Sequence, residues 1–187
     1  MAGLSLITSH TSKAYAQTPN CGRGGGSVTV IQHSDKPIVC DKSSGTRILS
    51  STSGGREIEI DMNQGPGEAI KITGPNTNIT IMKKITVTGS RGSGKPVIKV
   101  LSGGALTLNQ EVDVSEATGM IKKEIVVDGS ESSVTLNGKL TGFEGGEVKV
   151  SNEGMVVFEK GVKGIEEVKV KINDGGMVRL LGDVTFN

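Results

Sequence analysis

Hydrophobic and polar residues alternate with a period of two in the second half of the chain, and the alternating stretches repeat one template. The template is Val/Ile-x-Val/Ile, five linking residues, and then Val/Leu-x-Leu/Phe-x-x-x-Val/Leu. Four copies carry the anchors Leu106, Leu108 and Val112, then Val134, Leu136 and Leu140, then Val156, Phe158 and Val162, then Val178, Leu180 and Val184. Eight residues before these anchor sets stand Ile98, Val126, Val148 and Val170, which we expect to share one inward position.

A looser fifth copy precedes these four, with one extra residue in its turn and the anchors Ile70, Ile72, Ile79, Ile81 and Ile85. Successive first anchors (79, 106, 134, 156 and 178) differ by 27, 28, 22 and 22 residues, so the unit is about 22 residues long. Repeats of this length are typical of solenoids. Alternation at i and i+2 predicts strands, and no helical arm is visible.

Glycine-rich segments such as Ser102-Gly103-Gly104 separate the alternating stretches and suit tight corners. We therefore predict an all-β fold, a right-handed parallel β-helix whose inward Val, Ile and Leu form ladders along the axis. Only 2% of the residues are aromatic, which suits a thin core of branched side chains. The alternative, a β-sandwich, would give hairpin turns at shorter spacing.

Three regions are expected along the chain. Residues 1–16 are interpreted as a leader or signal-peptide remnant, because Ala14-Tyr15-Ala16 has the small-x-small form that signal peptidase cleaves. Residues 17–60 are predicted to form an irregular N-terminal cap with the first strands, and residues 61–187 the coils. The last strand stops without a polar capping element, so we expect the natural chain to continue.

The two cysteines, Cys21 and Cys40, both lie in the predicted cap. Their even number and modest spacing suit a disulfide, although two free thiols would also fit. Closing a loop of about 20 residues would stabilise the fold by roughly 3 kcal/mol. A disulfide implies an oxidising destination, such as the periplasm or the exterior.

The charge is balanced overall but uneven along the chain. Residues 1–100 hold 12 Lys and Arg against 6 Asp and Glu, whereas residues 101–187 hold 9 against 14, giving +6 and −5. This asymmetry fits either an acidic partner at the N-terminal end or ordinary solvated strand surfaces. No apolar run approaches the roughly 18 residues of a membrane span, so membrane insertion is not expected.

The segment from Gly89 to Lys95 has the G-x-x-x-x-G-K spacing of a phosphate-binding loop. Pro96 takes the place of the required Ser or Thr, and Val97 to Val100 alternates as a strand instead of starting a helix. We interpret the segment as a basic turn between coils. Neither nucleotide nor nucleic acid is an expected partner.

Metal and hydrolase chemistry have little support. Metal-ligand spacing is absent, and a Ser-His-acid site would depend on His33, because the only other histidine is His10. Glu57, Glu59 and Asp61 alternate and could form a paired-carboxylate site of the kind that cleaves polysaccharides. We interpret them instead as the solvated side of a strand, and we expect no catalytic residue, cofactor or metal.

The repeats at Thr86–Val100, Gly104-Ala105-Leu106-Thr107-Leu108 and Gly142-Phe143-Glu144-Gly145-Gly146 carry a family resemblance. Over about residues 17–187 the chain resembles the passenger segments of bacterial autotransporters, in particular the angiogenic passengers of vasoproliferative bacteria. The resemblance implies a protein that is secreted or displayed on the bacterial surface. It also implies a non-enzymatic ligand that activates a vascular endothelial growth factor (VEGF) receptor of the host and promotes angiogenesis.

The six residues that the second repeat has in excess of 22 fall around Ser115 to Lys123, and such insertions are the expected partner surfaces. This loop sets an apolar pair beside a basic pair, although a packed cover over the core would look the same. With nearby cations it gives a candidate receptor-binding face of Lys83, Lys84, Arg91, Lys95, Met120, Ile121, Lys122 and Lys123.

Three functions compete on these grounds. The leading hypothesis is a receptor ligand, and self-association would supply the bivalency that receptor activation needs. The second is an adhesin for host matrix or a heparin-like polysaccharide. The third is a polysaccharide-cleaving enzyme.

Overall fold

The computed structural model describes residues 18–24, 28–31, 36–51, 55, 57–65, 67–91 and 94–182. The predicted leader (1–16), His10, His33 and Val184 lie outside the described residues. The described residues form three β-sheets and one short 3-10 helix, η1 (Met62–Gln64). None of them belongs to a helix long and apolar enough to cross a bilayer.

We name the sheets A, B and C. Sheet A contains β1 (Val28–Ile31), β3 (Thr46–Ser51), β6 (Asn78–Ile81), β9 (Ala105–Leu108), β12 (Ser133–Leu136), β15 (Met155–Phe158) and β17 (Met177–Leu180). Sheet B contains β2 (Ile38–Cys40), β5 (Ile70–Thr73), β8 (Pro96–Leu101), β11 (Lys122–Asp128), β14 (Glu147–Ser151) and β16 (Lys169–Ile172). Sheet C contains β4 (Glu57–Asp61), β7 (Lys84–Thr88), β10 (Val112–Asp113) and β13 (Leu140–Thr141).

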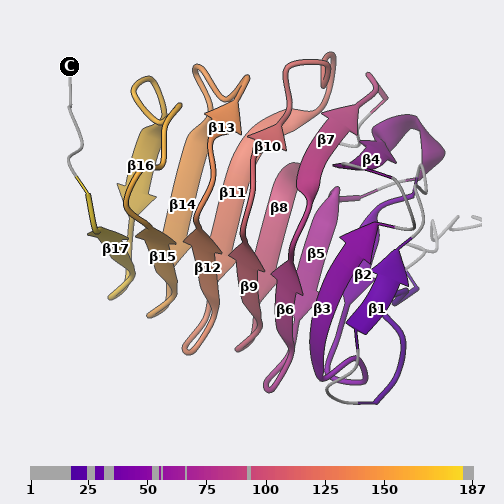
Figure 1. Ribbon diagram of the computed structural model, residues 1–187. Helices are drawn as coiled ribbons and strands as arrows, with labels where there is room; N and C mark the ends of the chain where they lie inside the picture. Colours follow the sequence, from indigo (N-terminus) through magenta and orange to yellow (C-terminus); the bar gives the residue numbers. More distant parts are fainter. Residues whose placement is uncertain are drawn as a thin grey trace, which may run out of the picture.

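From β2 to β15 the chain passes from sheet B to sheet A to sheet C and back to sheet B, and β15 then leads to β16. Each strand therefore pairs with the strand that follows one circuit later in the same sheet. In Figure 1 the strands of sheet A stand side by side in chain order, from indigo β1 to yellow β17. Every strand pair in the described part of the chain is parallel, so the all-β, parallel-sheet prediction is confirmed and the hairpin alternative is wrong.

The alternating aliphatic residues point inward and stack in register between circuits. Leu106 pairs with Ile79 on one side and Val134 on the other, and all three are at most 1% exposed. Fully burying such a side chain contributes about 1.5–3 kcal/mol. The stacked rows merge into one continuous core cluster.

One predicted inward position is wrong. Ile125 pairs with Ile98 and Val148, whereas Val126 pairs with the outward-facing Lys99 and Lys149. Ile125 is accordingly buried and Val126 only half-buried. The shift by one residue has a physical cause in the turn that follows β11.

That turn, from Asp128 to Ser133, is one residue longer than the corresponding turn from Ser151 to Met155. The buried hydroxyl of Ser132 closes it, donating to the carbonyl of Asp128 at 2.8 Å and accepting from the N–H of Gly103 at 2.8 Å. Counting back eight residues from Val134 therefore gives Val126, although the inward residue is Ile125.

The N-terminal end is tied to sheet B by a disulfide between Cys21 and Cys40, as the sequence predicts. The side chain of Asn20 supports this link. It donates to the carbonyl of Pro37 at 2.7 Å and accepts from the N–H of Val39 at 2.9 Å. Residues 18–24 are thereby held against β2 through both covalent and hydrogen bonds.

Candidate functional site: a basic corner between two sheets

The loops that lead from sheet C to sheet B lie on one another in successive circuits. Residues 89–95 connect β7 to β8, and residues 114–121 connect β10 to β11. The N–H of Thr118 donates to the carbonyl of Gly89 at 2.9 Å, and the N–H of Met120 donates to the carbonyl of Ser90 at 3.4 Å. The predicted surplus loop therefore rests directly on the basic turn before it.

Two local features bring these loops together. Gly119 has a φ of +67°, and a Cβ atom there would lie 2.4 Å from the carbonyl oxygen of Ser90, so only glycine allows this approach. On the other side, the side-chain oxygen of Asn63 accepts from the N–H groups of Ser90 and Arg91 at 3.1 and 3.0 Å. These two bonds fix the backbone of Ser90 and Arg91 to a side chain of the preceding circuit.

The corner gathers five of the eight sequence-predicted residues. Arg91, Lys95 and Lys122 are exposed, Met120 is 66% exposed, and Lys123 is half-buried. Lys122 pairs with Pro96, which directly follows Lys95, so cations from two circuits are neighbours. We call Arg91, Lys95, Met120, Lys122 and Lys123 the basic corner.

Ile121, the sixth predicted residue, does not face a partner. It is 7% exposed and belongs to the hydrophobic core, as does Ala117 in the same loop. The alternative interpretation of the loop as a packed cover is therefore right for Ile121, while Met120 beside it points to solvent. The loop is anchored by one apolar side chain and presents another.

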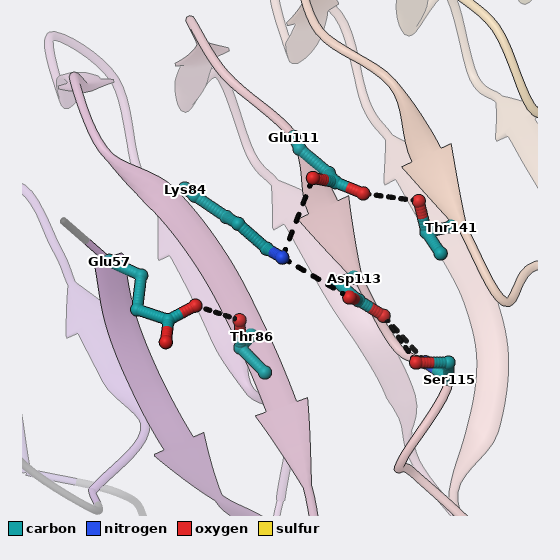
Figure 2. Close-up of polar contacts among 7 residues, drawn as sticks. All are labelled: Glu57, Lys84, Thr86, Glu111, Asp113, Ser115 and Thr141. Carbon is teal, nitrogen blue, oxygen red and sulfur yellow. Dashed lines mark hydrogen bonds and ion pairs between the residues drawn. The ribbon is translucent and has the colours of Figure 1, made fainter.

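Lys83 and Lys84 are not part of the basic corner, because β7 begins at Lys84 and reaches the corner only after Thr88. Figure 2 shows Lys84 between two carboxylates of the next circuit, with its Nζ 3.5 Å from Glu111 and 3.3 Å from Asp113. Partial desolvation lowers the pKa of Lys84, but the hydrogen bond and charge of Asp113 and the charge of Glu111 outweigh it and raise the pKa. Lys84 is thus a structural cation of sheet C.

Beside the basic corner runs a groove of about 360 Å³. Its lining combines Lys122 and Lys123 with acidic and glycine residues, namely Glu124, Glu144, Gly145, Gly146 and Glu147. Hydrogen bonds from Lys171 and Lys149 lower the pKa of Glu147, so this carboxylate remains charged. The groove therefore offers charges of both signs.

The outward side of sheet C carries a row of polar contacts between successive circuits, which the sequence did not predict (Figure 2). The Thr86 hydroxyl donates to Glu57 at 2.6 Å, and the Thr141 hydroxyl donates to Glu111. Asp113 accepts from the hydroxyl and the N–H of Ser115 at 2.6 and 3.0 Å. The Asp-x-Ser spacing was a visible signal, but the partners 29 and 30 residues away depend on the strand register.

The charge state of this row bears on acid–base chemistry. Partial burial raises the pKa of Asp113, but the Ser115 hydrogen bonds and Lys84 outweigh it, so the pKa falls below its ordinary value. A general acid for glycoside cleavage needs a raised pKa. Asp113 is instead held as an anion by its neighbours.

The remaining motifs are placed as follows. The segment after Lys95 is strand β8, so the predicted strand is confirmed and the G-x-x-x-x-G-K spacing does not lead into a helix N-terminus. Glu57, Glu59 and Asp61 face outward on β4, while Ile58 and Ile60 are fully buried, as predicted. Within the described ranges no three His, Cys, Asp or Glu residues are grouped to hold a metal ion.

Comparison with protein families, curated proteins and solved structures gives no match for this chain.

Proposed function

We propose that the chain is a right-handed parallel β-helix acting as a secreted, non-enzymatic autotransporter passenger. It binds and activates a VEGF receptor on host endothelial cells. The rotation of the chain through three parallel sheets supports the helical winding. The right hand follows the rule for parallel strands joined by crossovers. The disulfide Cys21–Cys40 fits an oxidising, extracellular location.

The observation that carries the binding proposal is the basic corner. Its cations come from two successive circuits, and Met120 adds an exposed apolar side chain among them. Protein interfaces commonly combine an apolar contact with charges that set orientation and rate. Loops on a rigid scaffold are also where binding residues concentrate.

The groove beside the corner favours a protein partner over a polyanion. Lys122 and Lys123 share it with Glu124, Glu144 and Glu147, which would repel a sulfated polysaccharide. A receptor surface with its own mixed charges can complement both signs. Heparin-like polysaccharide therefore remains the second candidate, supported only by the cations.

A polysaccharide-cleaving activity has weaker support from the carboxylates of sheet C. Glu57 and Glu111 each accept a hydrogen bond from a threonine hydroxyl, and Asp113 is engaged by Ser115 and Lys84. The contacts of Asp113 hold its pKa below the ordinary value, which does not suit a proton donor, and Glu57 and Glu111 are each engaged by a hydroxyl of an adjacent circuit. The arrangement is better suited to stabilising adjacent circuits than to catalysis.

The double variant Lys122→Glu with Lys123→Glu tests the receptor proposal. We expect its affinity for the receptor ectodomain to fall at least about 10-fold, because removing two attractive charges and adding two repulsive ones costs more than 1 kcal/mol. Receptor phosphorylation in endothelial cells should fall in parallel. Surface plasmon resonance and phosphotyrosine blotting measure the two effects, and circular dichroism confirms that the fold is kept.

The matched control is Lys139→Glu with Lys160→Glu, which makes the same charge change at two exposed positions away from the basic corner. Unchanged affinity in the corner variant, or equal losses in both variants, would reject the corner as the binding site. Retention on heparin that collapses with salt, without receptor phosphorylation, would support the adhesin hypothesis instead.

A further inference from the structure

Strand β11 begins with a β-bulge at the basic corner. Its register with β8 shifts between Lys122 and Ile125, where three residues along β11 span the length of two along β8. Counted back from the buried Ile125, regular alternation would point Lys123 into the core. The extra residue turns Lys123 to the same side as Glu124, and both line the groove beside the corner. Bulges are over-represented beside active sites, where they redirect a side chain.

The other side of the groove is the loop before β14, and glycine brings this loop close to β11. A Cβ atom at Gly146 would lie 2.4 Å from the carbonyl oxygen of Lys123, so only glycine allows the approach. Gly145 has a φ of +71°, and a Cβ atom there would meet nothing within 4 Å. Between its charged side chains, the groove is therefore bordered by bare backbone with open space above it, which suits the approach of an extended chain.

Two of the carboxylates in the groove, Glu124 and Glu147, already have partners on sheet B. The Nζ atom of Lys149 lies 3.3 Å from Glu124 and 3.2 Å from Glu147, and that of Lys171 lies 2.9 Å from Glu147. Hydrogen bonds to Glu147 and Glu124 outweigh partial desolvation and raise the pKa of Lys149, so this lysine remains charged. Both carboxylates are therefore matched by lysines that do not line the groove.

The other charged groups of the groove are two lysines and one glutamate, Lys122, Lys123 and Glu144. None of the ion pairs in the described part of the chain involves these three residues, nor the exposed Arg91 and Lys95 of the basic corner. The unmatched charge is thus predominantly positive, which attracts carboxylates. Glu144 limits how dense the incoming negative charge can be.

We infer that the groove binds an extended acidic segment of a protein, whose carboxylates pair with Lys122 and Lys123. Every second side chain of an extended segment points to the same side, so acidic residues that alternate with neutral ones can face both lysines. A heparin-like chain, which carries anions on all sides, would also meet Glu144. The inference rests on the proposed function for the identity of the partner as a receptor, whereas the chemistry of the groove can be tested without it.

A short capped peptide of alternating glutamate and serine tests the groove in the absence of a receptor. In NMR titrations of the intact chain at low ionic strength, it should shift the amide signals of Lys123, Gly145 and Gly146, with a dissociation constant on the order of 1 mM. The matched peptide of lysine and serine should leave these signals unchanged. Lys71, an outward lysine of β5, should shift much less and serves as the internal control.

Three results of the titration would overturn the inference. The first is the absence of any shift up to about 10 mM of the glutamate peptide. The second is an equal shift at Lys71, which would reduce the effect to a general attraction between opposite charges. The third is a heparin oligosaccharide that shifts the groove signals while the glutamate peptide does not, which would assign the groove to a polysaccharide.

Glu144→Lys tests the same chemistry on the receptor and predicts the sign of the effect. Replacing an unmatched anion by a cation should tighten binding to the glutamate peptide and to the receptor ectodomain, each by about 3-fold or more. The control Glu153→Lys makes the same charge change in the turn after β14 and should alter neither affinity. Both glutamates are exposed, so neither change should disturb the fold. Surface plasmon resonance measures the receptor affinities.

The outcomes separate this inference from the proposed function. A chain that binds the glutamate peptide but no receptor would support the acidic segment and reject the receptor as its source. A receptor affinity that falls with Glu144→Lys would reveal a basic partner segment and overturn the inference, although receptor binding would stand. Receptor affinities that are unchanged, or that rise equally in the Glu144 and Glu153 variants, would place the segment elsewhere and overturn it as well.

Discussion

Sheets A and C present the same kind of aliphatic ladder to the interior and opposite chemistry to solvent. On the inside, Ile58 of sheet C and Leu49 of sheet A are both fully buried. On the outside, sheet C carries Glu57, Lys84 and Asp113 with their polar partners (Figure 2), whereas sheet A carries uncharged residues such as Ile48, Ala105 and Thr107. The inward rows thus define the fold, and the outward rows can differ without disturbing it.

Successive circuits are also held together differently on the two sheets. On sheet C the circuits are linked by side-chain hydrogen bonds and by the ion pairs of Lys84. On sheet A the outward threonines stack in register without a charge among them. Only the first kind of contact responds to pH and ionic strength.

The largest effect should come from the inward ladders that all three sheets share, represented here by Ile125 of sheet B. Ile125→Ala removes a fully buried side chain packed between circuits and should cost about 2–5 kcal/mol of unfolding free energy. Val126→Ala removes an outward side chain and should cost less than about 1 kcal/mol. Chemical denaturation measures both, and equal losses would contradict the register found for β11.

A smaller, pH-dependent effect should be confined to sheet C. Asp113→Asn should cost about 1 kcal/mol at pH 7 by removing a charged hydrogen-bond acceptor. The pKa of Asp113 is lower in the folded protein than in the unfolded chain, so its carboxylate stabilises the fold above about pH 4. This stabilisation is lost as the pH falls through the folded value. The difference between variant and unchanged protein should therefore shrink in acid.

The control for that experiment lies on sheet A. Thr107→Val changes stability without changing a charge, so its effect should be the same at pH 7 and at pH 3. Thermal unfolding at several pH values compares the two variants. A pH-independent difference for Asp113→Asn would show that its contacts are not electrostatic.

The smallest effect should show that salt changes the stability contributed by sheet C but not that contributed by sheet A. Lys84→Met leaves Glu111 and Asp113 without their shared cation and should cost about 0.5–1 kcal/mol at low ionic strength. Adding about 1 M sodium chloride should reduce that cost, because screening weakens both attraction and repulsion. Thr80→Val, on the outward side of sheet A, should change the unfolding free energy by less than about 0.5 kcal/mol at either salt concentration.

The sequence alone predicted the strands and most of the register, because one-sided burial forces alternation of the kind seen in Glu57 to Asp61. It failed at Val126 because the run Ile125-Val126-Val127 is apolar throughout and gives no alternation to read. The extra residue in the following turn then shifted the eight-residue spacing by one position. The longer turn is seen only in the structure, from the strand register on its two sides and from the closing hydroxyl of Ser132.

The candidate site was predicted less completely, because its contacts depend on which residues of successive circuits lie side by side. Lys122 lies beside the preceding circuit because it pairs with Pro96, and the length of the surplus loop was visible in the repeat spacing. That Lys84 pairs with Asp113, or that Thr80, Thr107 and Thr135 align, depends on register across whole circuits. Contacts between residues nearly thirty positions apart have no local signal in the chain.

The loop from Val114 to Ile121 shows how this architecture can change in evolution or by engineering. It leaves one circuit and enters the next at positions fixed by neighbouring strands, and Ala117 and Ile121 are buried in the core while Met120 is exposed. Residues inserted at Met120 would lengthen a projection and leave the flanking ladders unchanged. Foreign peptide epitopes grafted there should be displayed in a defined place on a scaffold that still folds.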